Sequence, residues 1–138
     1  MQLEVKINLI LHATENESKI LEKLENVFHI EQKKFQVEEI PGHFDNPILL
    51  ISSKLKKKSA ENFVRVFFSK MKKTDYQEIF DNVEEYVISS GLSLRVSKQK
   101  LISEILTISK EDAIKININT PVYVKNETKK IYQELMRN

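Results

Sequence analysis

The segment PGHFDNP, residues 41–47, holds the densest group of side chains that could do acid–base chemistry. His43 lies two residues before Asp45, and an imidazole beside a carboxylate can move protons in catalysis. No nucleophile or metal ligand accompanies the pair. The chain has no cysteine, its three histidines stand at no metal-ligand spacing, and no serine has a G-x-S-x-G setting. The sequence therefore predicts no catalytic residue and no metal site.

The same segment has the composition of a tight turn. Gly42 tolerates a positive φ, Asn46 tolerates turn conformations, and Pro47 holds the residue before it extended. The segment 34–40 and the largely apolar segment 48–52 flank it as strands would flank a hairpin turn. We interpret the segment as a shape-determining turn, with a contact role for its histidine left open.

Composition predicts a single globular domain over residues 1–138. Hydrophobic residues make up 41% of the chain, and a domain of this length buries about 68% of its unfolded surface. The absence of cysteine fits a reducing compartment, and no apolar run approaches the ~20 residues of a membrane helix. We expect a cytoplasmic protein that needs no cofactor and no membrane.

Hydrophobic periodicity predicts the elements. Residues 3–11, 92–96 and 114–118 alternate apolar and polar side chains, as strands with one polar face do. A helix is expected to follow a capping box at Thr14 and Glu17. Further helices are expected over 59–73, over 75–89 with Gly91 as the stop signal, and over 126–137. The segment 101–109 suits either element, and its Ile and Thr content favours a strand.

This order of elements predicts an α+β fold. Strands with one polar face suit an antiparallel sheet that is covered on one side only. We therefore expect two layers, an antiparallel sheet with helices packed on one face.

Charge is segregated along the chain although the total is only +2. Residues 54–73 contain eight basic residues and one acid, a local charge of +7, and residues 75–85 contain five acids and no base. Within the first window, five polar residues share one helix face opposite the aromatics: Lys58, Asn62, Arg65, Ser69 and Lys72. Such a face can follow a phosphate backbone, or it can be a solvated face paired with the acidic helix.

The polar sheet face carries cations and amides but no aromatic residue. Alternation assigns to it Lys6, Asn8, Ser93, Arg95, Lys115, Asn117 and Asn119. The lack of an exposed Phe or Tyr argues against the RNA-recognition module whose sheet stacks bases. Binding through phosphates and sugars stays open.

Three segments together resemble one family. They are HATENESKILEKLENVF, GHFDNPILLISSKL and LRVSKQ, which begin at residues 12, 42 and 94. Over about residues 1–120 the chain resembles the archaeal RNA-binding proteins that include predicted exosome subunits. The resemblance implies a fold similar to the ribosomal protein that binds five-S RNA, and a non-catalytic, RNA-associated role.

The resemblance also implies positions of interest. In the turn they are Gly42, His43, Asn46 and Pro47, and after the later strand they are Arg95, Lys98 and Gln99. Two positions depart from the family pattern, because Asp45 replaces a usual glycine and Ser97 replaces a usual aspartate. The first weakens a phosphate role for the turn, and the second bears on the orientation of Arg95 and Lys98.

The leading hypothesis is a non-catalytic RNA-binding protein, acting alone or as an accessory to an RNA-processing or exosome-type assembly. The residues expected to contact RNA are Lys54, Lys56, Lys57, Lys58, Arg65, Lys72, Lys73, Arg95, Lys98 and Lys100. The alternative is a protein–protein adaptor or homo-oligomer, such as a homodimer, that uses the basic and acidic helices as complementary surfaces. An enzyme built around His43 is a third reading.

The turn reading is tested by His43→Ala. RNA affinity should stay nearly unchanged, and the free energy of unfolding should change by ~1 kcal/mol or less if the ring is exposed. Titration with labelled RNA and urea denaturation measure these two quantities. Loss of a hydrolytic activity in this variant would instead establish an enzyme.

Overall fold

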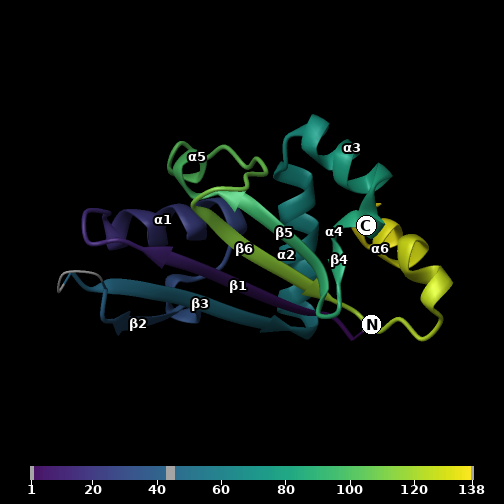
Figure 1. Cartoon of the computed structure of the whole chain (residues 1–138), viewed down its shortest axis with the longest axis horizontal. Coiled ribbons are helices and arrows are strands. Elements are labelled where there is room, and N and C mark those ends of the chain that lie inside the picture. The colour runs from purple at the N-terminus through teal and green to yellow at the C-terminus, as the bar shows by residue number, and fades with distance from the viewer. Residues whose placement is uncertain (1, 43–45, 138) are drawn as a thin grey trace.

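The computed structural model describes residues 2–42 and 46–137, so His43 and Asp45 of the acid–base hypothesis lie outside the described residues. Within these residues six strands form one antiparallel sheet in the order β2-β3-β1-β6-β5-β4 (Figure 1). The strands are β1 (Glu4–Leu11), β2 (Gln36–Ile40), β3 (Ile48–Lys56), β4 (Val87–Ile88), β5 (Gly91–Ser97) and β6 (Ala113–Asn119).

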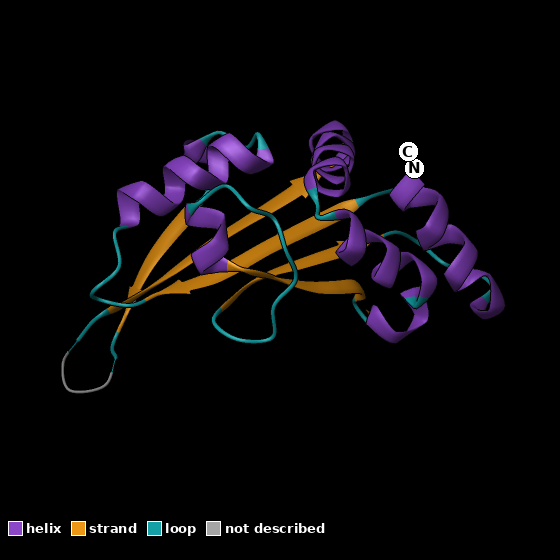
Figure 2. Cartoon of the chain, turned by 90° about the horizontal axis from the view of Figure 1, so that it is seen from above, coloured by secondary structure: helices purple, strands orange, loops and turns teal. Residues whose placement is uncertain are grey.

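The helices cover one face of the sheet and leave the other uncovered (Figure 2). They are α1 (Glu17–Phe28), α2 (Lys57–Lys70), α3 (Lys73–Asp81), α4 (Val83–Tyr86), α5 (Lys98–Ile102) and α6 (Thr128–Arg137), with 3-10 turns η1 (Gln32–Lys34) and η3 (Lys125–Glu127). The expected two-layer α+β architecture, with an antiparallel sheet, is confirmed.

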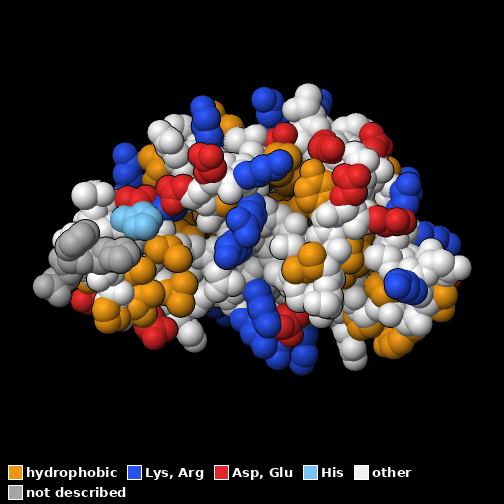
Figure 3. Space-filling model, viewed as in Figure 1, with side chains coloured by type: hydrophobic (Ala, Val, Ile, Leu, Met, Phe, Trp, Pro, Cys, Tyr) orange, Lys and Arg blue, Asp and Glu red, His pale blue; other side chains and the backbone are white. Residues whose placement is uncertain are grey.

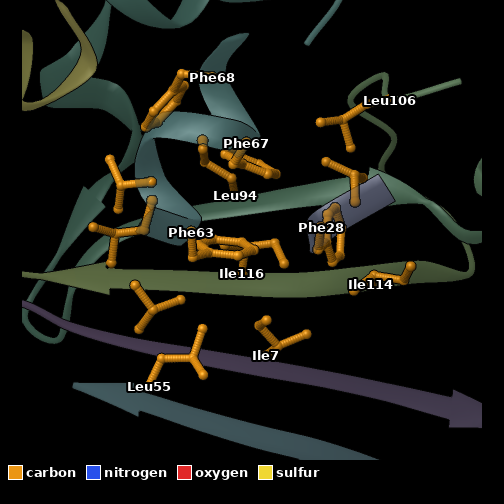
Figure 4. Close-up of a cluster of buried hydrophobic side chains, with 14 of the residues drawn as sticks. Ile7, Phe28, Leu55, Phe63, Phe67, Phe68, Leu94, Leu106, Ile114 and Ile116 are labelled. Atoms are coloured by element: carbon orange, nitrogen blue, oxygen red, sulfur yellow. The ribbon is translucent and has the colours of Figure 1, made fainter. Parts of the chain in front are cut away.

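The core lies between α1, α2 and the covered face of the sheet. Every second side chain of β1 is buried, as the alternation at 3–11 predicts. On the helix side Phe63 and Phe67 stack with ring centroids 5.3 Å apart, and Phe28 meets Phe63 edge-on at 5.4 Å (Figure 4). Each such ring removed from water stabilises the fold by about 1.5–3 kcal/mol. The aromatic stripe of α2 is therefore core and does not form a base-stacking platform.

The start of α1 differs from the predicted capping box. Asn16, not Thr14, is the N-cap, and its side-chain oxygen accepts a hydrogen bond from the Lys19 amide at 3.0 Å. The Glu15 carboxylate accepts a second from the His12 amide at 2.9 Å. The sequence offers several capping residues in a row, and the local hydrogen bonds decide among them.

The region predicted as one helix over 75–89 contains two helices and a strand. Helix α3 ends at Asp81, α4 ends at Tyr86, and Val87 begins β4, which pairs with β5. Gly91 is not a helix stop. It opens β5 with a φ of 119°, in the hairpin that joins the two strands. Pairing with β5 stabilises an extended Val87 and Ile88 that local periodicity assigned to a helix.

The segment 101–109, predicted as a strand, begins with the end of α5 and continues without a named strand. Only isolated bridges form there, from Ile108 to Val96 and from Leu106 to Met71. Ser97 caps α5 by accepting a hydrogen bond from the Lys100 amide at 3.0 Å. Leu101 and Leu106 are both buried, and backbone hydrogen bonds from Ser97 to Thr107 and from Ser109 to Arg95 hold the rest of the segment beside β5.

Gly91→Ala tests the importance of the β4–β5 hairpin. A Cβ at this position would collide with the Ile118 carbonyl oxygen of β6, and its backbone lies in the region that favours glycine. We expect the free energy of unfolding to fall by about 2 kcal/mol. Urea denaturation checks this, with Ser89→Ala in the same turn as the control. An unchanged midpoint for Gly91→Ala would contradict the hairpin geometry.

Candidate nucleic-acid interface

The basic helix face lies along α2 on the side away from the core. We call Lys58, Asn62, Arg65, Ser69 and Lys72 the helix stripe, and all five are exposed. The stripe begins at a sharp corner, because β3 ends at Lys56 and α2 begins at Lys57 with no linker. Lys57 has a φ of 54°, a strained conformation for a residue with a Cβ. Three consecutive lysines are thus presented where the sheet meets the helix.

The helix stripe is not neutralised by the acidic helices. Among the ion pairs of the described residues, none involves Lys57, Lys58, Arg65, Lys72 or Lys73. Within residues 2–42 and 46–137, the Arg65 guanidinium donates one long hydrogen bond, 3.4 Å, to the Asn62 side-chain oxygen. The stripe therefore keeps a positive field that solvent and salt alone screen.

A hollow of about 250 Å³ opens beside the stripe, between the end of α1, η1 and α2. Arg65 and Asn62 line it from α2, and His29 and Lys34 line it from the opposite wall. Lys70 is excluded from the stripe, since its ammonium lies 3.0 Å from His29 Nε2 and donates to the Asn26 carbonyl at 3.2 Å.

A second basic surface covers the bare side of the sheet. The side chains of the four central strands that point away from the helices form a surface that we call the open face. Its residues are Glu4, Lys6, Asn8 and Ile10 of β1, Leu50, Ser52, Lys54 and Lys56 of β3, Ser93 and Arg95 of β5, and Lys115, Asn117 and Asn119 of β6. Figure 3 looks onto this face and shows Lys and Arg side chains in a line across its middle.

Strand register brings these cations together from distant parts of the sequence. Lys6 lies directly across from Lys54, and Arg95 lies directly across from Lys115. The only carboxylate of the open face is Glu4, which is 3.5 Å from the Lys54 ammonium and 3.9 Å from that of Lys6. Arg95 and Lys115 have no ion-pair partner among the described residues.

Lys98, expected to contact RNA, is instead buried. Its ammonium donates to the Ile10 carbonyl oxygen at 2.6 Å and pairs with Glu15 at 2.9 Å and Asp112 at 3.0 Å. Only 3% of its side chain is exposed. A buried ammonium needs such partners, because removing it from water without them is costly. Lys98 therefore joins β1 to α5 and is not available to a phosphate. Lys100, two residues later, is exposed.

The family-motif turn lies at the far end of the β2–β3 hairpin from the corner at Lys56. A Cβ at Gly42 would collide with the Asn46 carbonyl oxygen, so the turn needs glycine there because of that contact. Asn46 and Pro47 are exposed, and His43 lies outside the described residues. The structure does not bring this turn beside the helix stripe.

The sequence did not predict an aromatic residue beside the open face. Tyr86 lies at the end of α4, next to the β4–β5 pairing, and lines a hollow of about 440 Å³ with Ser93, Arg95 and Lys110. Periodicity assigned Tyr86 to the apolar stripe of a helix. The run VISSGLSL, two apolar segments around a turn, was the signal that could have indicated the hairpin.

The carboxylates of α3 and α4 lie near Tyr86 and the 103–110 segment and interact with them. Burial and the nearby Glu78, Glu85 and Asp75 carboxylates raise the pKa of Tyr86 above its ordinary value. Asp75 accepts hydrogen bonds from the Thr107 hydroxyl and the Ile108 amide, which holds the 103–110 segment against α3.

Residues 2–42 and 46–137 lack two features. No helix there is long and apolar enough to cross a membrane. No group of three or more His, Cys, Asp or Glu side chains there could hold a metal ion.

Comparison with known proteins gives a family. The model of the family described as RNA binding matches residues 4–120. An RNA-binding protein of Pyrococcus abyssi is 30% identical over 126 residues, which cover 86% of this chain and 82% of that protein. A crystal structure from Sulfolobus solfataricus superposes with a TM-score of 0.78 at 26% identity, covering 96% of both chains. A solved structure of a protein from Methanothermobacter thermautotrophicus gives a TM-score of 0.74 at 23% identity, covering 99% of this chain and 97% of that one.

Replacing Lys98 with Met separates a structural role from RNA contact. The Met side chain keeps the volume but leaves two carboxylates and a buried carbonyl without their donor. We expect the free energy of unfolding to fall by about 2 kcal/mol, since the carboxylates are partly solvated and do not suffer the full cost of a buried charge. Urea denaturation measures this.

The exposed Lys100→Met serves as the control and should change stability by about 0.5 kcal/mol or less. RNA affinity of folded Lys98→Met should match that of the unmodified protein. A variant with normal stability and weakened RNA binding would return Lys98 to the contact set.

Proposed function

Because this chain belongs to the family described as RNA binding, we propose that it is a non-catalytic RNA-binding protein that contacts the phosphate backbone through the helix stripe of α2. The relative from Pyrococcus abyssi, which is named as an RNA-binding protein, supports the same reading.

One observation carries the choice of surface: the cations of the stripe are exposed and form no ion pair among the described residues. If this face served only solubility, its cations would be expected to form ion pairs with the acidic helices that follow in the sequence. Unpaired cations on one rigid helix face keep a field that attracts a polyanion and speeds its approach. A guanidinium at mid-stripe, in Arg65, suits a phosphate through its planar fork.

The composition of the stripe favours contacts that do not read sequence. Lysine ammonium groups and a serine hydroxyl bind phosphate oxygens, which are the same at every nucleotide. The stripe carries no exposed aromatic residue that would stack on a base. We therefore propose that this surface contributes affinity without selecting bases.

An accessory role follows from binding of this kind. We extend the proposal to a non-catalytic accessory of an RNA-processing or exosome-type assembly, because an RNA-degrading enzyme needs RNA held regardless of its sequence. The cysteine-free composition supports a reducing, cytoplasmic setting. Copurification that resists ribonuclease treatment would identify protein partners within such an assembly.

The adaptor reading remains the competing function. Its motivation is the unpaired basic stripe together with the exposed acids of α3 and α4, which two copies could bring together. A homodimer of this kind would dissociate with salt, and light scattering at low and high salt measures it. RNA binding by a monomer in the same buffer would exclude the adaptor as the main role of the stripe.

Arg65→Ala is the sharpest test of the stripe. Four phosphate contacts predict a logarithmic salt slope of roughly −3 for single-stranded RNA, at ~0.7 for each neutralised phosphate. The variant should weaken binding about equally for different RNA sequences and flatten the slope by ~0.7. Fluorescence anisotropy across a salt series gives both values.

Lys19→Ala is the matched control, because Lys19 is an exposed cation in the first turn of α1, away from the end of α1 that meets α2. It should leave both affinity and slope unchanged. Absence of RNA binding by the unmodified protein at ~50 mM salt, where phosphate contacts are strongest, would rule out the proposed function.

A further inference from the structure

The open face carries a marked excess of positive charge. Five cations lie on the four central strands, against the one carboxylate of Glu4: Lys6, Lys54, Lys56, Arg95 and Lys115. Lys6 and Lys54 lie directly across from each other on β1 and β3, where like charges are destabilising, and the single carboxylate of Glu4 balances only one of their two charges. A sheet that keeps such a pair gains from a polyanion that neutralises it.

Two hollows flank the Arg95–Lys115 pair at neighbouring strands. One, of about 440 Å³, lies at the β5 edge and is lined by Tyr86, Ser93 and Lys110. The other, of about 260 Å³, lies over β1 and is lined by Asn8, Ile10 and His12. Both combine apolar side chains with a few polar groups, which is the lining typical of sites for small molecules.

The charges around the larger hollow define which part of a nucleotide fits each place. The carboxylates of Glu78, Glu85 and Asp75 act electrostatically on the Tyr86 hydroxyl and disfavour a phosphate beside it. Arg95, on the other side of the hollow, favours one. A nucleotide therefore fits with its neutral base against Tyr86 and its phosphate over the cations.

We propose that the open face of the sheet binds single-stranded RNA, with phosphates over Arg95 and Lys115 and a base stacked on Tyr86. The proposal rests on the RNA-binding function and adds the form of RNA and the surface that selects it. A duplex keeps its bases paired inside the helix, whereas a base of a single strand can turn into a hollow.

The proposed path of the single-stranded RNA follows the line of cations in Figure 3. From Arg95 on β5 to Lys54 on β3 it crosses three strand spacings, about 14 Å, which a few nucleotides span. Lys56 then leads to the corner where Lys57 and Lys58 begin α2. The open face and the helix stripe thus join at this corner, and one RNA chain can occupy both.

The test compares a labelled single-stranded oligouridine with a duplex of the same length, both by fluorescence anisotropy. The double variant Arg95→Ala with Lys115→Ala should weaken binding of the single strand about tenfold and flatten its salt slope by ~1.4, because two phosphate contacts are lost. Duplex affinity should change far less.

Tyr86→Leu keeps apolar packing and removes the ring. It should weaken binding of the single strand about tenfold with no change in salt slope, as expected for a lost stacking contact. Tyr86→Phe retains the ring and should bind as the unmodified protein does. Thermal unfolding of each variant verifies that the hairpin is intact, and the double variant tests the proposal independently of Tyr86.

The outcomes separate this inference from the proposed function. If Arg65→Ala weakens binding while the open-face variants bind oligouridine normally, the open-face site is wrong and the helix stripe remains. Equal losses for single strand and duplex would also overturn the selection of single strands. If neither form of RNA binds the unmodified protein at ~50 mM salt, both proposals fail together.

Discussion

The packing of α2 against the sheet is the interaction on which the rest of the structure depends. Phe63 and Phe67 lie between the helix and the strands, together with Phe28 of α1, and no water reaches them. Because one side of α2 is fully used for this contact, its other side must be polar, and that side carries the stripe. Because the helices cover one face of the sheet only, the strands must alternate, and their outward side chains form the open face. Both basic surfaces are consequences of a single apolar interface.

The cationic side chains differ in the partners with which they interact. Lys98 is buried and has three oxygen partners, so its ammonium is structural. Lys6 and Lys54 share Glu4, whereas the stripe cations have no carboxylate partner among the described residues. Exposed pairs contribute little to stability, so leaving the stripe unpaired costs the fold little. The unpaired cations are the ones free to interact with a phosphate, and their arrangement supports function more than stability.

The acidic helices complete the electrostatic arrangement without cancelling it. Asp75 is occupied with Thr107 and the Ile108 amide, and the neighbouring acids lie around Tyr86. Arg137 of α6 lies over the Phe80 ring of α3, so the end of the molecule formed by α3, α4 and α6 carries both acids and bases. The cations of the open face lie together with one carboxylate, and that surface is the more favourable one for a polyanion. The expected likeness to the ribosomal protein that binds five-S RNA stays a prediction.

The sequence by itself determined the fold class, the core residues and the polar identity of the open face. Those features follow from periodicity, which is local: Val5, Ile7 and Leu9 alternate whatever their partners are, and the α2 aromatics recur at helical spacing. Tertiary structure decided the rest. Lys98 reads as one more exposed cation until Glu15 and Asp112, far away in the chain, meet its ammonium. Val87 and Ile88 read as helix residues until β4 pairs with β5. Charge partners and strand register are contacts between distant segments, so no local pattern encodes them, and it is these contacts that separate a structural lysine from a binding one.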